Sequence, residues 1–233
     1  MTLLHPIHLI PLISGFFTVF WLIFPFAAFS QTSPGNDLDI SPEIRENSPV
    51  LRRWLRKVPN ILHEIKNEPS FRTRIRVGYS LFPANQNRSG VNVGIEDVLI
   101  PNTPITVRGE YETSFDGQLQ RYGADLQYYL RPLGSYVNVA PVFGYRHVQT
   151  NRDDTHGVNV GGKLLFSLSR GGGADITLTQ TWVAPGSREE VGLTSLSLGY
   201  AIAKNIRIST DIQQQNTRHG KDSRVGLVLE WMP

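Results

Sequence analysis

The 233-residue chain contains no cysteine, which excludes a disulfide framework and thiol chemistry. It also has no GxSxG, HExxH or P-loop motif, so the common nucleophile, zinc-protease and nucleotide-binding signatures are missing. The net charge is only +3, and no helix-turn-helix, finger or RNP signature accompanies it. We therefore predict no catalytic residue, no metal, no cofactor and no nucleic-acid partner.

Charged side chains are missing from residues 1–30, and the stretch from Leu9 to Phe29 is nearly all apolar. Ala28 and Ser30 fit the small-x-small pattern of a signal-peptidase site, which predicts a signal peptide over 1–30 with cleavage before Gln31. The alternative is a retained membrane anchor, because about 20 apolar residues can span a bilayer. In both cases the rest of the chain is exported.

Residues 31–70 are predicted to form a polar lead followed by a short amphipathic helical arm. The lead is rich in Ser, Pro, Gly, Asn and Asp, which favours disorder. The apolar residues of the arm recur at helical spacing: Leu51, Trp54, Leu55, Val58, Leu62 and Ile65. Two interpretations stay open, a helix on the membrane surface with Trp54 at the interface, or a helix packed against the end of the following domain.

Residues 71–233 alternate between apolar and polar side chains. In the first ribbon, FRTRIRVGYSL, one parity carries Ile75, Val77 and Tyr79, and the other carries Arg72, Arg74 and Arg76. Because successive side chains of a strand point to opposite faces, the ribbon has one apolar and one polar face. Ten such ribbons are predicted, at 71–82, 91–96, 105–115, 121–131, 136–148, 158–168, 174–182, 191–200, 206–214 and 224–231.

This pattern predicts an all-β fold, an antiparallel up-and-down transmembrane β-barrel of about ten strands, with 8–12 as the range. Pro141 removes a ladder donor and predicts a bulge in its ribbon. A change of parity in the eighth ribbon predicts a second bulge near Thr194. The connections alternate between short and longer polar segments, so we expect the longer ones together at the outer end.

The apolar face could contact lipid or fill a core. The ribbons are mostly about 9–11 residues long, as membrane-crossing strands are, and aromatic residues cluster near their ends. We predict that these residues lie at the membrane interface, together with Trp54: Tyr79, Tyr111, Tyr122, Trp182, Tyr200 and Trp231. The alternative is a soluble periplasmic barrel that binds an apolar ligand inside.

On these features, residues 71–233 resemble small outer-membrane β-barrel proteins of double-membraned bacteria, in architecture and not through a specific motif. The resemblance implies an outer-membrane location, with membrane lipid and the barrel-assembly machinery as partners. Such proteins commonly end in an aromatic residue. Here Trp231 is followed by Met232 and Pro233, so that signal is displaced.

If the apolar face meets lipid, the other parity lines a cation-rich lumen. The expected lining is Arg72, Arg74, Arg76, Glu96, Arg108, Glu110, Glu112, Arg121, Asp125, Arg146, Lys163, Arg207, Asp211 and Glu230, with Arg131, Asp175 and Arg224 on the same parity. Buried charges must pair, and a barrel of this size is nearly filled by its side chains, so one interpretation is a salt-bridged plug. The other is a narrow path whose cations favour a small anionic solute. The corresponding functions are a structural envelope protein or a narrow solute channel, both non-enzymatic.

One enzymatic alternative remains, a protease or lipid-modifying enzyme at the outer rim. His156 and His219 fall in predicted outer loops, with Asp153 and Asp154 close to the first. A histidine beside carboxylates is the usual acid–base pair of such enzymes. Because no nucleophile motif accompanies them, the same residues are also explained as solvated turn residues.

Overall fold

The computed structural model describes residues 47–50, 68–150, 153–218 and 220–233. The chain divides into two units, Met1–Val58 and Pro59–Pro233, which are described separately. The predicted signal peptide, its cleavage site and most of the predicted arm, including Trp54, lie outside the described residues. In the part of the chain that is described, no helix is long and apolar enough to cross a membrane.

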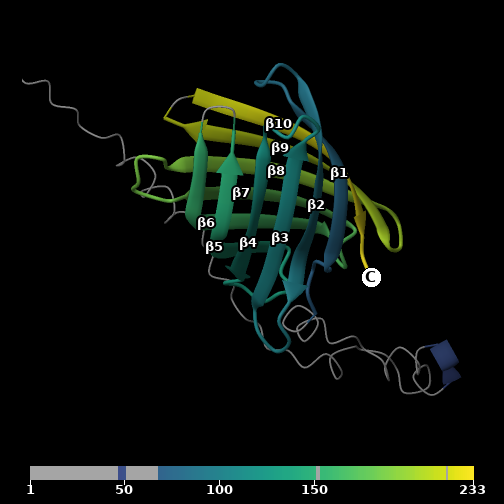
Figure 1. Ribbon diagram of the computed structural model, residues 1–233. Coiled ribbons are helices and arrows are strands. Elements are labelled where there is room, and N and C mark those ends of the chain that lie inside the picture. Colours follow the sequence, from purple (N-terminus) through teal and green to yellow (C-terminus); the bar gives the residue numbers. More distant parts are fainter. Residues whose placement is uncertain (1–46, 51–67, 151–152, 219) are drawn as a thin grey trace, which may run out of the picture. The chain divides into compact units, whose positions relative to one another are not determined.

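The described residues of the second unit form a closed barrel of ten strands, each antiparallel to its neighbours (Figure 1). The chain runs up and down in sequence order, and β1 pairs with β10 to close the sheet. The strands are β1 (Arg74–Phe82), β2 (Arg88–Leu99), β3 (Ile105–Ser114), β4 (Gln120–Tyr128), β5 (Val137–Gln149), β6 (Asp154–Ser169), β7 (Ala174–Val183), β8 (Val191–Ala203), β9 (Ile206–Thr217) and β10 (Gly220–Trp231). The predicted fold class is confirmed, and closure leaves no unpaired sheet edge.

The apolar face of the barrel is its outer face. On β1, the exposed fractions of Ile75, Val77 and Tyr79 are 40%, 56% and 48%, whereas that of Arg74 is 3%. The same alternation runs through the other strands, so Val, Ile, Leu and aromatic side chains cover the outside. A soluble barrel would hide these side chains, so the alternative of a water-soluble barrel with an apolar core does not fit the structure. The arrangement is that of a transmembrane barrel.

The two ends of the barrel are defined by the chain. The first end holds the start of β1, the end of β10 and the connections 100–104, 129–136, 170–173 and 204–205; the second end holds 83–87, 115–119, 150–153, 184–190 and 218–219. The connections predicted to be longer all lie at the second end, but the expected contrast in length is wrong, because 129–136 at the first end is longer than any of them. β6, β9 and β10 continue as strands through polar residues that the sequence predicts to be loops.

The two predicted bulges are also absent. β7 and β8 pair without a shift past Thr194, because Val191 and Leu193 point into the lumen and the parity does not change at this position. Pro141 stays in register opposite Gly162 of β6. Its missing N–H is tolerated because it lies just beyond the last pair of the β4–β5 ladder.

Candidate functional site: the lumen of the barrel

The middle of the lumen is filled by charged side chains, which we call the ionic layer. In the described residues, its ion pairs join eight cations to eight anions in one continuous network. The cations are Arg74, Arg76, Arg108, Arg121, Arg146, Lys163, Arg207 and Arg224, and the anions are Glu96, Asp97, Glu110, Glu112, Asp125, Asp175, Asp211 and Glu230. Eight positive and eight negative formal charges cancel.

Two arginines of β1 connect distant strands across the lumen. Arg76 lies 2.9 Å from Glu96 of β2, 2.9 Å from Asp211 of β9 and 3.0 Å from Glu230 of β10. Arg74 lies 2.6 Å from Asp97 and 3.0 Å from Asp175 of β7. A guanidinium presents five donors in a planar fork, so one side chain can bind several carboxylates at once.

Lys163 of β6 is the most enclosed cation of the layer. Its ammonium nitrogen lies 3.2 Å from Glu96, 2.9 Å from Asp97 and 3.0 Å from the side-chain oxygen of Gln127, and its side chain is 0% exposed. All three donors of the ammonium therefore have acceptors. Tyr129 completes the cluster, because its hydroxyl donates to Asp97 over 2.8 Å.

The β3–β5 side of the layer is built on the same plan. Arg146 of β5 lies 2.6 Å from Glu110 of β3 and 2.6 Å from Asp125 of β4. Glu112 pairs with Arg121 of β4 and, at 2.7 Å, with Arg224 of β10. Each anion thus faces at least one cation, as charges removed from water require.

Asp97 belongs to the network but was missed by the sequence analysis. Glu96 and Asp97 are consecutive, so strict alternation puts them on opposite faces. The β2–β3 register shifts between Ile95 and Val98, and Asp97 has a φ of 55°, so both carboxylates point inward. The signal was available in the sequence, since the apolar parity changes from Ile95 to Val98 across the two acids.

Two predicted lumen cations lie elsewhere. Arg72 precedes β1, and its guanidinium donates to the carbonyl oxygens of Lys204 and Pro233, at 3.3 and 3.0 Å, at the first end. Arg131 lies beyond β4 and is exposed. The prediction that both line the lumen is wrong. β1 starts after the predicted ribbon 71–82 begins, and β4 ends before the predicted ribbon 121–131 does. With these two outside and Asp97 inside, the expected excess of cations disappears.

An apolar cluster, the first-end cap, closes the lumen below the ionic layer. It consists of Phe71, Tyr129, Ala140 and Leu165, with Leu133 packed against them. Phe71 stacks on Tyr129 with ring centroids 4.8 Å apart. Phe71 shares the apolar parity of Ile75 and Val77, which predicts an outward position, but it precedes β1 and lies buried inside.

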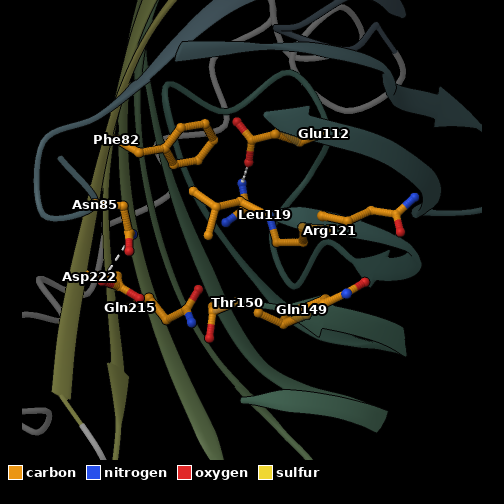
Figure 2. A pocket seen from close by; sticks show the side chains of 11 residues that line it. Phe82, Asn85, Glu112, Leu119, Arg121, Gln149, Thr150, Gln215 and Asp222 are labelled. Atoms are coloured by element: carbon orange, nitrogen blue, oxygen red, sulfur yellow. Dashed lines mark hydrogen bonds and ion pairs between the residues drawn. The ribbon is translucent and has the colours of Figure 1, made fainter. Parts of the chain in front are cut away.

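A second apolar cluster, the second-end cap, lies inside the barrel toward the second end, on its β5, β7 and β8 side. It contains Val148, Val183, Val191 and Leu193, all at most 2% exposed. Beside it lies a pocket of about 40 Å³, lined by Phe82 and Leu119 as well as polar groups (Figure 2). A side-chain hydrogen bond of 3.1 Å between Asn85 and Asp222 lies at the edge of this pocket.

Little space is left within the ionic layer. Two cavities of about 20 Å³ each have been found there. They share six lining residues, namely Arg76, Glu96, Arg108, Glu110, Asp211 and Arg224. Each has room for about one water molecule, which needs roughly 10–15 Å³ of such volume and several polar partners.

The predicted interface aromatics point outward. Tyr79, Tyr111, Tyr122, Trp182, Tyr200 and Trp231 all have exposed fractions of 40% or more. Trp231 lies at the first end of the barrel and Trp182 at the second. Their contact with a membrane interface stays a prediction.

His156 lies within β6 and is not in an outer loop, which corrects the prediction. On the outer face it is paired with His147 of β5, whose Nε2 is 2.5 Å from Asp154 Oδ1. His219 lies outside the described residues. Among those that are described, no cluster of three or more His, Asp or Glu side chains is arranged to hold a metal ion.

No family model and no curated protein matches the chain. Among solved structures, a chain named KdgM porin is similar over 69% of this chain and 99% of its own, at 10% identity and a TM-score of 0.41. At that level the likeness contributes nothing to the argument on function, which depends on the geometry of the lumen and of the outer face.

Proposed function

We propose that the chain is an integral outer-membrane β-barrel, exported through its N-terminal segment, that acts as a closed structural element of the envelope. The observation that carries this proposal is the inverted distribution of side chains. Apolar residues cover the outside, and a neutral ionic layer between two apolar caps fills the inside. Lipid is therefore the partner of the outer face, and the barrel-assembly machinery is the expected route of insertion.

The lumen supports closure for two physical reasons. The caps place apolar side chains in the path of an ion, and an ion that crossed would have to displace partners from pairs held at 2.6–3.2 Å. Removing one partner from a buried pair is costly, at about 3–5 kcal/mol. The same pairs connect strands that are not neighbours in the sheet, as Arg74 does between β1 and β7. We therefore assign the ionic layer to holding the barrel together from within.

A narrow solute channel is the second candidate, and one observation favours it. The two water-sized cavities share six residues, so there is room for water within the ionic layer on the way between the caps. Movement of the caps would turn that space into a path. The equal numbers of cations and anions remove the reason to expect an anion preference, because selection by a ring of charge needs an excess of one sign.

A non-enzymatic role is part of the same proposal. Among the described residues, His156 lies beside His147 on the outer face of β5 and β6. The nearest acid of this pair is Asp154, and a nucleophile motif is missing from the sequence. A hydrolytic activity that disappears in His147→Ala while the barrel still forms would contradict this part of the proposal.

The experiment is to purify residues 31–233 and compare unheated with boiled samples on a gel, then to record conductance in planar bilayers. We expect a detergent-dependent form that migrates faster before boiling and gives no steady conductance. A protein that is soluble without detergent would contradict the membrane barrel. Steady single-channel currents from the wild type would favour the channel.

A double variant separates the two candidates further. Phe71→Ala with Leu193→Ala removes one large side chain from each cap. We expect conductance to appear in this variant only, and not in Leu198→Ala, which changes an outward leucine of the same strand β8. If the double variant folds and stays silent, the ionic layer alone closes the lumen.

A further inference from the structure

The outer face of the barrel carries a polar groove at the second end. It has a volume of about 360 Å³ and lies over β7, β8, β9 and the connection 184–190. Its lining residues are Gln180, Trp182, Gly186, Ser187, Glu190, Gly192, Thr194, Asn216, Thr217 and Arg218. Amides, hydroxyls and one exposed indole dominate the groove, in contrast to the apolar surface next to it.

The change from apolar to polar surface is abrupt and spans three strands in register. Leu178, Leu196 and Ile212 lie opposite one another on β7, β8 and β9 and point outward. Two residues farther toward the second end, the outward row contains Gln180, Thr194 and Gln214 instead. Two residues of strand cover only about 7 Å. A single ligand lying across the two rows would therefore contact apolar side chains at one end and polar side chains at the other.

Gly192 gives the groove its floor. Residues 182, 192 and 216 lie in register, and a Cβ built on Gly192 would stand 3.7 Å from the Trp182 ring and 3.9 Å from Asn216. Because Gly192 has no side chain, the indole of Trp182 stays accessible and is 41% exposed. Ordinary contact distances at Gly192 also mean that a larger residue could be placed there without distorting the sheet.

The groove has an acceptor that the described residues do not satisfy. The Oδ1 atom of Asn216 is buried and has no hydrogen-bond partner among them. Thr194, in contrast, donates its hydroxyl to the side-chain oxygen of Gln180. A buried acceptor without a donor costs free energy, which favours a rotation of the Asn216 amide that presents Oδ1 to a ligand hydroxyl in the groove.

We propose that this groove binds the carbohydrate head group of a membrane glycolipid. The sugar hydroxyls would meet the amides of Gln180 and Asn216, and an apolar face of the sugar ring would lie on Trp182. The acyl chains of the same lipid would run along the row of Leu178, Leu196 and Ile212. This inference rests on the proposed membrane location, because only there does the apolar row meet lipid.

The test uses the folded protein in a sugar-free amine-oxide detergent, titrated with dodecyl maltoside, while the indole N–H signal of Trp182 is followed by NMR. We expect a saturable shift. Gly192→Val fills the groove, and we expect it to weaken binding by about tenfold or more, equivalent to ~1.4 kcal/mol. Asn216→Leu should weaken binding in the same direction by removing the unsatisfied acceptor.

The matched control is Gly109→Val, a glycine-to-valine change on the outer face of β3, away from the groove. It should bind like the wild type. Heat-dependent gel migration checks that each variant forms the barrel. If Gly192→Val forms the barrel and binds as the wild type does, the groove is not the site.

Two further titrations identify the chemistry. Maltose without a tail should bind at least about tenfold more weakly, because the apolar row then contributes nothing. Equal binding of maltose and maltoside would overturn the lipid part of the proposal. Equal shifts from a sugar-free dodecyl amphiphile would overturn the carbohydrate part. A barrel that is soluble without detergent would contradict the membrane function separately, since solubility is measured before any titration.

Discussion

The ionic layer and the two apolar caps occupy the same lumen but obey different rules. In the layer, each side chain is held by direction and charge, as Lys163 is by its three acceptors. In the caps, side chains such as Leu193 are held by burial alone. The difference teaches that apolar residues near its ends shield a polar lumen from water. The directed ion pairs in the middle determine how the side chains there are arranged.

The largest expected effect tests whether charge balance governs the layer. Lys163→Met removes one cation and leaves Glu96 and Asp97 with an excess of negative charge. We expect the free energy of unfolding to fall by about 3–5 kcal/mol, measured by urea titration in detergent. Adding Asp97→Asn restores neutrality, and asparagine tolerates the positive φ at this position.

The double variant should therefore recover a large part of the lost stability, which would be seen as a coupling free energy between the two positions. Additive losses would show that balance is not the governing property of the layer. In that case the layer and the caps would follow the same rule, namely packing.

The second prediction compares burial inside with exposure to lipid on one strand. Leu193→Ala in the second-end cap should lower the free energy of unfolding by about 2–5 kcal/mol, because a cavity is left in a packed cluster. Leu198→Ala, also on β8, removes a side chain that is 44% exposed on the outer face, and its effect should be clearly smaller. Equal losses in the same urea titration would contradict the division into cap and outer face.

The third prediction concerns the space that the ionic layer needs. A Cβ at Gly199 would overlap a terminal nitrogen of Arg207 and lie 3.3 Å from Asp175. Gly199→Ala should displace the guanidinium and cost about 1–3 kcal/mol. Gly162→Ala is the control, since a Cβ there has nothing within 4 Å. If both variants unfold at the wild-type urea concentration, the layer is less tightly packed than the distances indicate.

The smallest effect lies outside the lumen, at the second end. Asp116, in the connection 115–119, has a pKa lowered below its usual value because the Ser114 hydroxyl donates to it over 2.5 Å. A carboxylate whose folded pKa is lowered stabilises the fold above its unfolded pKa, and this contribution is lost as the pH falls through the folded value. Asp116→Asn should thus differ slightly from the wild type at pH 6 and converge with it below about pH 3.9. A difference that grows on acidification would contradict the assignment.

Strict alternation over ten ribbons predicted the barrel and its strand number, because alternation depends on local geometry alone. The inside-out character was predicted from the length of the ribbons and from the aromatic residues near their ends. The sequence did not predict that Val191 and Leu193 face the lumen. Apolar residues at positions of the polar parity were interpreted as the sign of a β-bulge, which would have kept them on the outer face. Nor did the sequence predict the inward turn of Asp97, which depends on a left-handed residue at a bulge. The ends of strands were misplaced for a similar reason. Polar residues beyond the apolar belt were taken for loops, although hydrogen bonding continues through them.

The seam between β1 and β10 has a consequence for assembly. Arg76 on one side of the seam contacts Glu230 on the other, and Asp211 one strand farther on. While the sheet is still open, these partners stand apart and each must keep its own shell of water. Joining the first strand to the last therefore completes the ladder and removes that water in one event, so the final step of closure is also the step that dries the lumen.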